Sequence, residues 1–292
     1  MRVGVRGVSV AVVVLGGAAL AGAQDFGAQA PTAVAAIKNA CDAAGGLDAF
    51  RKLGIVQIEV TREEITQDGH TSAARNGFFF TAPGPTPGRL EVPEKKVIAG
   101  DDGDKGWAVI DGQPDPKPST QYMVKRLLHG DLFPLLLPFS LTWEGVSITG
   151  VEPAEVEGRQ VWRLRVQLAR SFFFTPQIGT QWTVDLDRKT YMLVRAESPA
   201  TDIGKGMVAD GMRFSWEGPV KVGSVWFRST QRLEGVDMDG NPKAHNRVDK
   251  IVYKLLPPTM SAQLFANPIP PELRPKLPIG KPPQQPATAP KK

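Results

Sequence analysis

The sequence predicts a mainly β fold of the α+β type, in which a curved antiparallel sheet carries helical elements against its concave side. Two observations predict the sheet. From Ile55 onward, apolar and polar residues alternate along much of the chain, which is the period of a half-buried strand. Turn sequences separate these runs, so we expect about ten strands joined mostly by short turns. A third observation, helical spacing in two other stretches, predicts the covers that bury the apolar face of the sheet.

Residues 1–23 precede this pattern and have the features of a secretory signal peptide. Arg2 and Arg6 are followed by an uncharged apolar run from Val8 to Ala21, and the sequence A-G-A then fits a cleavage site after Ala23. A membrane anchor is the alternative, but the run is shorter than the ~20 residues that a spanning helix needs. We therefore expect an exported protein that resides in the periplasm.

Residues 267–292 are rich in proline and basic side chains, so we expect an extended, disordered tail. Residues 24–266 then form one domain, which is long enough to build a core of its own. The formal net charge of +5 comes from the two ends, because residues 24–271 hold 28 basic and 29 acidic residues. A body this close to neutral argues against a nucleic-acid-binding surface. We expect a monomer, and the single cysteine, Cys41, excludes an intramolecular disulfide.

Two helices are expected before the first strand. Residues 31–46 carry apolar side chains at helical spacing, with Thr32 as the N-cap and Gly45-Gly46 as the end. Cys41 falls on the apolar face and is predicted to be a small buried hydrophobe rather than a reactive thiol. A short helix over residues 47–53 follows. The expected buried face of the first helix consists of Val34, Ile37, Ala40, Cys41 and Ala44.

The strands with the strictest alternation define the face that we expect to point inward. The inward positions are Val56, Ile58 and Val60; Trp162, Leu164, Val166 and Leu168; Trp182, Val184 and Leu186; and Met212, Phe214 and Trp216. Turns are expected at Asp68-Gly69, Asp111-Gly112, Glu157-Gly158, 187–189, Val222-Gly223 and Asp239-Gly240.

Four tryptophans on or beside these strands are candidates for lining a ligand cavity, namely Trp143, Trp162, Trp182 and Trp216. Aromatic residues in such positions are most often packed core, and both interpretations remain open at the level of the sequence.

One helical stretch interrupts the strands at residues 118–133, with Ser119 as the expected N-cap. Its expected apolar face holds Tyr122, Met123, Leu127 and Leu128.

The sequence LFPLLLPF at residues 132–139 follows this helix. Because Pro134 and Pro138 lack an N–H, we expect neither a helix interior nor a central strand there. A segment this apolar is also unsuited to solvent. It is predicted either to form the rim of an apolar cavity or to plug the barrel as core. The residues concerned are Leu132, Phe133, Leu135, Leu136, Leu137 and Phe139.

Catalytic and metal-binding patterns are weak in this sequence. His70, His129 and His245 have no partner at metal-ligand spacing, and no nucleophile elbow or phosphate-binding loop is present. The acidic clusters at 100–106 and 237–242 resemble fragments of calcium loops, but turn chemistry of Asp and Gly explains them better. We therefore predict no enzymatic activity, no metal and no cofactor.

The order of several segments resembles the outer-membrane lipoprotein-sorting proteins of the LolA/LolB-like superfamily. These segments include AAGGLDAFRKLGIVQIEV, GRLEV, DGDKGWAVIDG, LFPLLLPF, QWTVDLDRKTYMLVRAE, RFSWEGPVKVGSVWFRST and RVDKIVYKL, within residues 32–265. The resemblance implies an incomplete antiparallel β-barrel with an apolar interior and helices as a lid. It also implies an arginine that latches the lid, which aligns with no position here. The basic tail and the triple-phenylalanine runs at 78–80 and 172–174 depart from the carriers.

Three functions compete. The first is a periplasmic carrier or binder of the acyl chain of a lipid or lipoprotein. The second is an interaction module with a plugged barrel that binds an envelope protein. The third, a hydrolase of envelope lipids, lacks any supporting motif. A largely uncharged cavity of several hundred Å³ would favour the carrier, and a filled barrel would favour the interaction module.

Overall fold

The structure is a computed structural model that describes residues 29–65, 68, 70–72, 75–81, 84, 87–102, 106–115, 117–169, 180–204 and 207–273. The predicted signal peptide, the end of the predicted tail and Phe172–Phe174 therefore lie outside the described residues. Within the described part, no helix is both long and apolar enough to cross a membrane.

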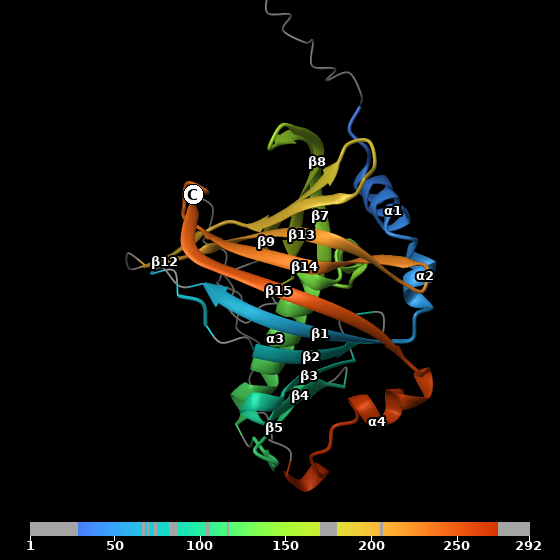
Figure 1. The fold of residues 1–292 in the computed structure, drawn as a ribbon, viewed down its shortest axis with the longest axis vertical. Coiled ribbons are helices and arrows are strands. Elements are labelled where there is room, and N and C mark those ends of the chain that lie inside the picture. Colours follow the sequence, from blue (N-terminus) through green and yellow to red (C-terminus); the bar gives the residue numbers. More distant parts are fainter. Residues whose placement is uncertain are drawn as a thin grey trace, which may run out of the picture.

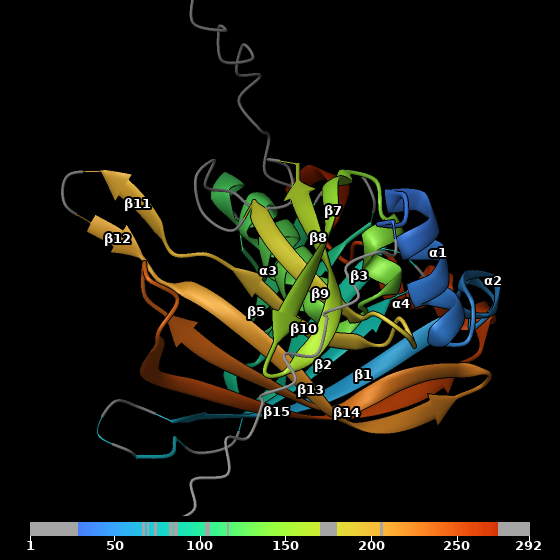
Figure 2. The ribbon, with the colours of Figure 1, turned by 90° about the horizontal axis from the view of Figure 1, so that it is seen from above.

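One antiparallel sheet of thirteen strands dominates the fold, in the order β6-β5-β4-β3-β2-β1-β15-β14-β13-β10-β9-β8-β7. The sheet is curved, as Figure 2 shows from above. Because β6 and β7 remain its two edges, the barrel that it forms is incomplete. The strands are β1 (Ile55–Ile65), β2 (Arg75–Thr81), β3 (Gly88–Val92), β4 (Val97–Asp101), β5 (Gly106–Ile110), β6 (Gln113–Pro114), β7 (Val146–Val156), β8 (Arg159–Leu168), β9 (Gln181–Asp187), β10 (Leu193–Ser198), β13 (Gly211–Val222), β14 (Val225–Val236) and β15 (Pro242–Leu256).

This architecture confirms the predicted fold class. The first and last strands pair in the middle of the sheet, from Ile55 opposite Leu256 to Ile65 opposite Asn246. Two short strands, β11 (Thr201–Gly204) and β12 (Met207–Ala209), form a separate hairpin between β10 and β13. The tight turns at Asp111-Gly112 and Glu157-Gly158 are confirmed, because all four residues adopt the positive φ that such hairpin turns require.

The first helix, α1 (Ala33–Ala43), begins as predicted, since the N–H of Ala35 donates to Oγ1 of Thr32 at 3.2 Å. Its predicted face was wrong at one position, because Val34 is 78% exposed and Ala36 is buried instead. Val34 lies in the first turn of α1 and faces away from the core. Cys41 is buried as expected, and burial raises the pKa of its thiol to about 12. α2 (Leu47–Arg51) follows.

The middle helix, α3 (Pro118–Leu135), corrects the prediction that LFPLLLPF starts as irregular chain. The helix continues through Pro134, which removes only one hydrogen bond near the C-terminus, and the N–H of Leu136 still donates to Leu132 O at 3.0 Å. Burial of Leu132 and Phe133 outweighs that loss. The N-cap is Lys117 rather than Ser119.

The apolar face of α3 also differs from the predicted one. Met123 and Leu127 are exposed, whereas Val124 and Leu128 are buried with Leu132 in the core. This face turns toward β3, β4 and β5, and α3 runs from the β5 end of the sheet to its middle (Figure 1). After α3, a short 3₁₀ helix, η2 (Phe139–Thr142), leads into β7.

The last described residues lie against β1, β2 and β3. α4 (Ser261–Phe265) is followed by η4 (Pro271–Leu273), and Ile269 between them is 2% exposed. The N–H of Ile269 donates to Oδ1 of Asn267 at 3.0 Å. Ile269, a buried apolar side chain, thus lies two residues beyond the expected start of the tail at residue 267.

Candidate functional site: the concave side of the half-barrel

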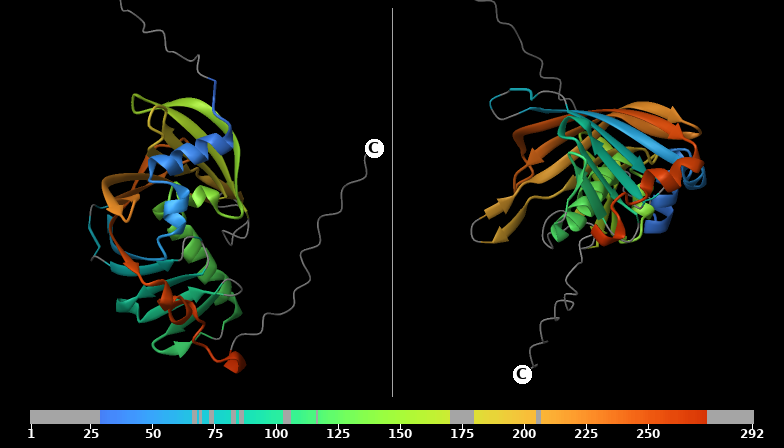
Figure 3. Two further views of the ribbon diagram at one scale, coloured as in Figure 1. Left: turned by 90° about the vertical axis from the view of Figure 1, so that its right-hand side faces the viewer. Right: turned by 90° about the horizontal axis from the view of Figure 1, so that it is seen from below.

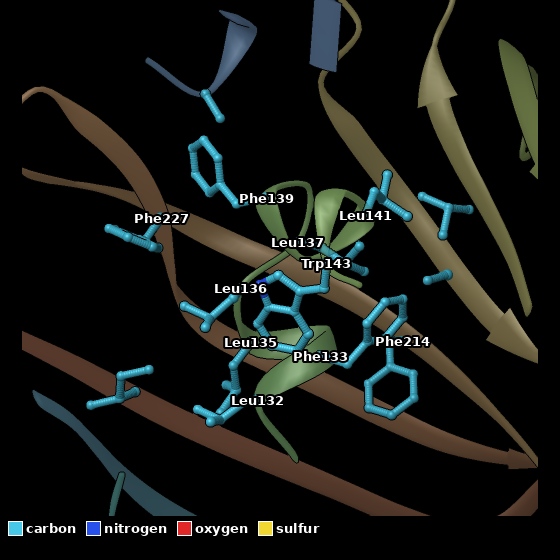
Figure 4. Close-up of a cluster of buried hydrophobic side chains, with 14 of the residues drawn as sticks. Leu132, Phe133, Leu135, Leu136, Leu137, Phe139, Leu141, Trp143, Phe214 and Phe227 are labelled. Atoms are coloured by element: carbon cyan, nitrogen blue, oxygen red, sulfur yellow. The ribbon is translucent and has the colours of Figure 1, made fainter. Parts of the chain in front are cut away.

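The concave side of the sheet is filled by residues Leu132–Trp143, which we call the plug. Its eight large apolar side chains are between 0% and 7% exposed (Figure 4). They are Leu132, Phe133, Leu135, Leu136, Leu137, Phe139, Leu141 and Trp143. The hydroxyl of Ser140 donates to Phe133 O at 2.7 Å, so the plug also closes on itself by a buried hydrogen bond.

Two phenylalanines anchor the plug to different parts of the barrel. The ring of Phe139 stacks on Phe50 of α2, with centroids 4.3 Å apart and planes 1° apart, and lies 6.2 Å from Phe227 of β14. The ring of Phe133 meets Trp182 of β9 edge-on at 5.2 Å. Trp182 in turn stacks on Phe214 of β13 at 5.4 Å. These aromatic contacts make the plug a part of the core rather than a loose loop.

All ten candidate residues are therefore brought together on the concave side. Nine are buried, and Trp216 is partly buried against the same cluster. The inward orientation predicted for Trp182 is confirmed by its contacts with Phe133 and Phe214. Their burial agrees with the expectation of packed core, and contact with a lipid remains a prediction for each of them.

A small apolar cavity lies between α1, the plug and three strands, and we call it the α1 slot. Its volume is ≈ 20 Å³, which is just enough for one water molecule. Three of the candidates, Leu135, Leu137 and Trp216, line it. The other lining residues are Ala40, Ala44, Pro138, Met192, Leu193, Trp226, Phe227 and Arg228.

A buried polar row crosses the concave face beside the plug. Gln231 accepts a hydrogen bond from the indole of Trp216 at 3.1 Å and lies 3.5 Å from the carboxylate of Asp249. Arg62 of β1 donates to Asp249 at 3.0 Å and to Asp131 of α3 at 3.3 Å. Burial acts to lower the pKa of Arg62, but the carboxylates of Asp131 and Asp249 outweigh it and hold that pKa above its ordinary value.

The polar row was missed by the sequence analysis, although a pattern could have revealed it. Arg62 continues the inward alternation of Val56, Ile58 and Val60 along β1. Pairing then places Arg62 opposite Asp249, and Asp249 opposite Gln231. A charged residue at an inward position of a strand is a candidate for a buried ion pair. The Arg62–Asp131 contact at 3.3 Å joins β1 to the C-terminal part of α3, just before the plug, so it ties the plug to the sheet.

A second cavity, of ≈ 450 Å³, lies on the opposite side of β7, β8 and β9. Its lining includes Glu152, Arg163 and Arg165, which alternate along the strands with core residues. Arg163 binds Asp185 through two hydrogen bonds of 2.7 and 3.0 Å, and Arg165 binds Glu152 in the same manner. A cavity with this charged lining is unsuited to an acyl chain.

His129 and the acidic cluster at 237–242, which were considered as catalytic or metal-binding groups, have structural explanations. His129 of α3 is buried, and burial, reinforced by Lys125, lowers the pKa of its imidazole to about 4. The carboxylate of Asp237 accepts the N–H groups of Asp239 and Asn241, which is the turn chemistry expected at 237–242. In the described ranges, no three His, Cys, Asp or Glu side chains are grouped so that they could hold a metal ion.

Comparisons with known proteins identify the fold. No protein-family model and no curated protein matches the sequence. A LolA superfamily protein from Nitrosomonas europaea superposes with a TM-score of 0.53 at 11% identity, over 77% of this chain and 96% of that one. A putative outer membrane lipoprotein-sorting protein domain from Vibrio parahaemolyticus gives a TM-score of 0.49 at 11% identity, over 79% and 100% of the two chains. A DUF1329 family protein from Desulfovibrio piger gives a TM-score of 0.48 at 13% identity, over 78% of this chain and 98% of that one. The chain thus has a LolA-like fold, which confirms the resemblance drawn from the sequence.

Proposed function

We propose that this LolA-like half-barrel is a periplasmic carrier that binds the acyl chain of a lipid or lipoprotein between α1 and the concave face, and that α1 is the cover that moves. The observation that carries the proposal is the α1 slot. Its lining is almost wholly apolar, and it is closed on one side by the small side chains Ala40 and Ala44. In this proposal the conformation described above is the closed, unloaded form.

The free energies of apolar burial favour a movement of α1 over a displacement of the plug. Exposing eight large apolar side chains at about 1.5–3 kcal/mol each would cost roughly 12–24 kcal/mol. Burying a chain of about 16 carbons gains only about 13 kcal/mol, at ~0.8 kcal/mol per CH₂. The fully buried residues of α1 and its C-cap are the small side chains Ala36, Ala40, Cys41 and Ala44, with Ile37 partly buried beside them, so exposing this face costs several kcal/mol by the same measure, less than exposing the plug. An acyl chain can offset the second cost but hardly the first.

The Arg62–Asp131 ion pair fits this division of roles. It ties the plug to the sheet, whereas α1 is held chiefly by apolar contacts. Among the described residues, its polar contacts with the sheet and the plug are the hydrogen bond from Trp226 N–H to Ala44 O at 2.8 Å and a weak one from the Cys41 thiol to Pro138 O at 4.0 Å. We infer that the plug is the permanent floor of the site and α1 the removable cover.

The proposal is tested by extracting the protein purified from its envelope and identifying co-purified lipids by mass spectrometry, alongside titration with a fluorescent fatty acid. We expect stoichiometric acyl-chain lipid or saturable binding of the probe. A protein that carries no lipid and leaves the probe free at tens of micromolar would contradict the carrier function. The predicted lack of enzymatic activity and the periplasmic location remain part of the proposal.

A second candidate is an interaction module that binds an envelope protein with its barrel permanently filled. The specific observation in its favour is the burial of the plug, whose residues Leu132, Phe133, Leu136 and Phe139 are fully enclosed. This function predicts the absence of bound lipid and no response to the fatty-acid probe, so the same experiment separates the two candidates.

A further inference from the structure

One end of the half-barrel gathers three segments that are far apart in the sequence, and we call it the α2 pole. The corner between α1 and α2 meets the turn between β13 and β14, where Gly45 lies against Ser224 O and leaves no room for a side chain. A Cβ on Gly223 of that turn would lie 3.0 Å from Leu53, and one on Gly54 would lie 3.1 Å from Pro258 after β15. Figure 3 shows this end of the molecule facing the viewer on the left.

The α2 pole exposes large apolar side chains that the fold leaves uncovered. Trp226 at the start of β14 is 41% exposed, Leu255 at the end of β15 is 44% exposed, and Met260 is 39% exposed. Pro257 and Pro258 between the last two are exposed as well. These side chains lie on segments that meet at the pole, and exposed large apolar side chains on neighbouring segments mark an interaction site more often than isolated ones do.

Basic side chains surround this apolar surface. Arg51, Lys52, Lys221 and Lys254 are exposed on the same segments, and the ammonium of Lys221 lies 5.6 Å from the centroid of the Trp226 ring. The acidic side chains near them are Asp48 of α2, Asp42 at the end of α1, which pairs with Lys38, and Glu59 of β1, which Lys254 contacts at 3.3 Å. The pole is therefore net basic on a body that is nearly neutral, and such asymmetry directs a protein toward a negatively charged partner.

We propose that the α2 pole docks on the surface of an anionic lipid bilayer. A tryptophan beside lysines suits the headgroup region, because the indole occupies the boundary between apolar and aqueous layers while the lysine chains extend toward lipid phosphates. Each basic residue near an anionic surface strengthens binding, and the exposed leucine and methionine supply area for shallow insertion. The lysine beside the indole favours a lipid surface, and binding to vesicles that hold no protein separates this occupant from an acidic protein partner.

The position of the pole connects it to the site described above. Trp226 belongs both to the exposed surface and to the lining of the α1 slot, next to Ala44. A bilayer at the α2 pole would therefore face the end of the slot nearest to the α1–α2 corner. The docking proposal does not depend on acyl-chain binding, and the two are measured separately.

The test is co-sedimentation of the full chain with vesicles of phosphatidylcholine alone and with vesicles containing 30% phosphatidylglycerol. We expect binding only to the anionic vesicles, weakened by added salt. Trp226→Ser should reduce the partition coefficient roughly tenfold. Lys52→Glu/Lys221→Glu, two surface changes that leave the core untouched, should reduce it by roughly five-fold for each lysine.

The matched control is Met123→Ser/Leu127→Ser, which removes two exposed apolar side chains from α3, away from the pole. It should bind like the wild type, and circular dichroism should show native folding for every variant. The proposal is overturned if the wild type ignores anionic vesicles, as a protein-binding surface would. It is also overturned if the pole variants bind as well as the wild type, since the basic tail would then account for the binding.

Discussion

Asp249 offers the sharpest test of the energetics of the concave face. Its carboxylate is completely buried and accepts from Arg62 at 3.0 Å, with Arg247 at 3.1 Å and Gln231 at 3.5 Å. Changing Asp249→Asn keeps the shape but leaves two buried guanidinium groups with one fewer negative charge. Removing one partner of a buried ion pair typically costs about 3–5 kcal/mol. Since a domain is stable by about 5–15 kcal/mol in total, a loss of this size is readily measured.

The matched control is the exposed pair of Glu217 and Arg232, whose atoms are 2.9 Å apart but whose side chains are 59% and 49% exposed. Glu217→Gln should cost no more than about 1 kcal/mol, because water screens an exposed pair. Both variants are compared by urea denaturation at low and at 1 M salt, and only the control should respond to salt. If Asp249→Asn costs as little as Glu217→Gln, the buried row does not stabilise the fold and the reasoning fails.

Three further predictions follow from burial and pKa. Because burial lowers the pKa of His129 from 6.5 to about 4, the unfolded chain binds more protons than the folded one between these values. The free energy of unfolding should therefore fall by up to ~3 kcal/mol as pH drops from 6.5 to 4. In His129→Gln this component should vanish from urea titrations, and an unchanged pH dependence would refute it. Trp182→Ala should cost ~3–5 kcal/mol, since the indole packs between Phe133 and Phe214; a loss below ~1 kcal/mol in urea titration would instead indicate a loosely filled cavity. Truncation after Asn267 should lower the melting temperature by several degrees through loss of buried Ile269, whereas truncation after Leu273 should not; equal melting temperatures would show that Ile269 contributes nothing.

The sheet and its inward face could be predicted because strand alternation is a local property. Trp162, Leu164 and Val166 are buried as their spacing indicates, and Asp-Gly or Glu-Gly pairs fix the turns. The pairing of β1 with β15 could not be predicted from alternation, because the two strands lie about two hundred residues apart in the sequence. Alternation does not say which of the other strands pairs with either of them.

The plug shows where local rules fail. Proline predicts an irregular segment at residues 132–139, but α3 extends through Pro134 because the surrounding barrel buries Leu132 and Phe133 completely. Met123 and Leu127 of α3 were expected to be buried with Leu128 and are exposed instead, for a related reason. Met123, Val124, Leu127 and Leu128 span more of the helix circumference than one interface can cover, and only the position of β4 and β5 decides which of them is buried.

The most direct test of the central claim, that an acyl chain enters the α1 slot, is a comparison of two leucine truncations by fluorescent fatty-acid titration. Leu137→Ala enlarges the slot. Leu164→Ala removes the same atoms from a buried leucine of β8 that does not line the slot, so it opens a cavity elsewhere in the core. Each should lose about 2–5 kcal/mol of stability. The account predicts tighter probe binding by Leu137→Ala and wild-type affinity for Leu164→Ala. Equal affinity in the two variants, whether raised or unchanged, would contradict it.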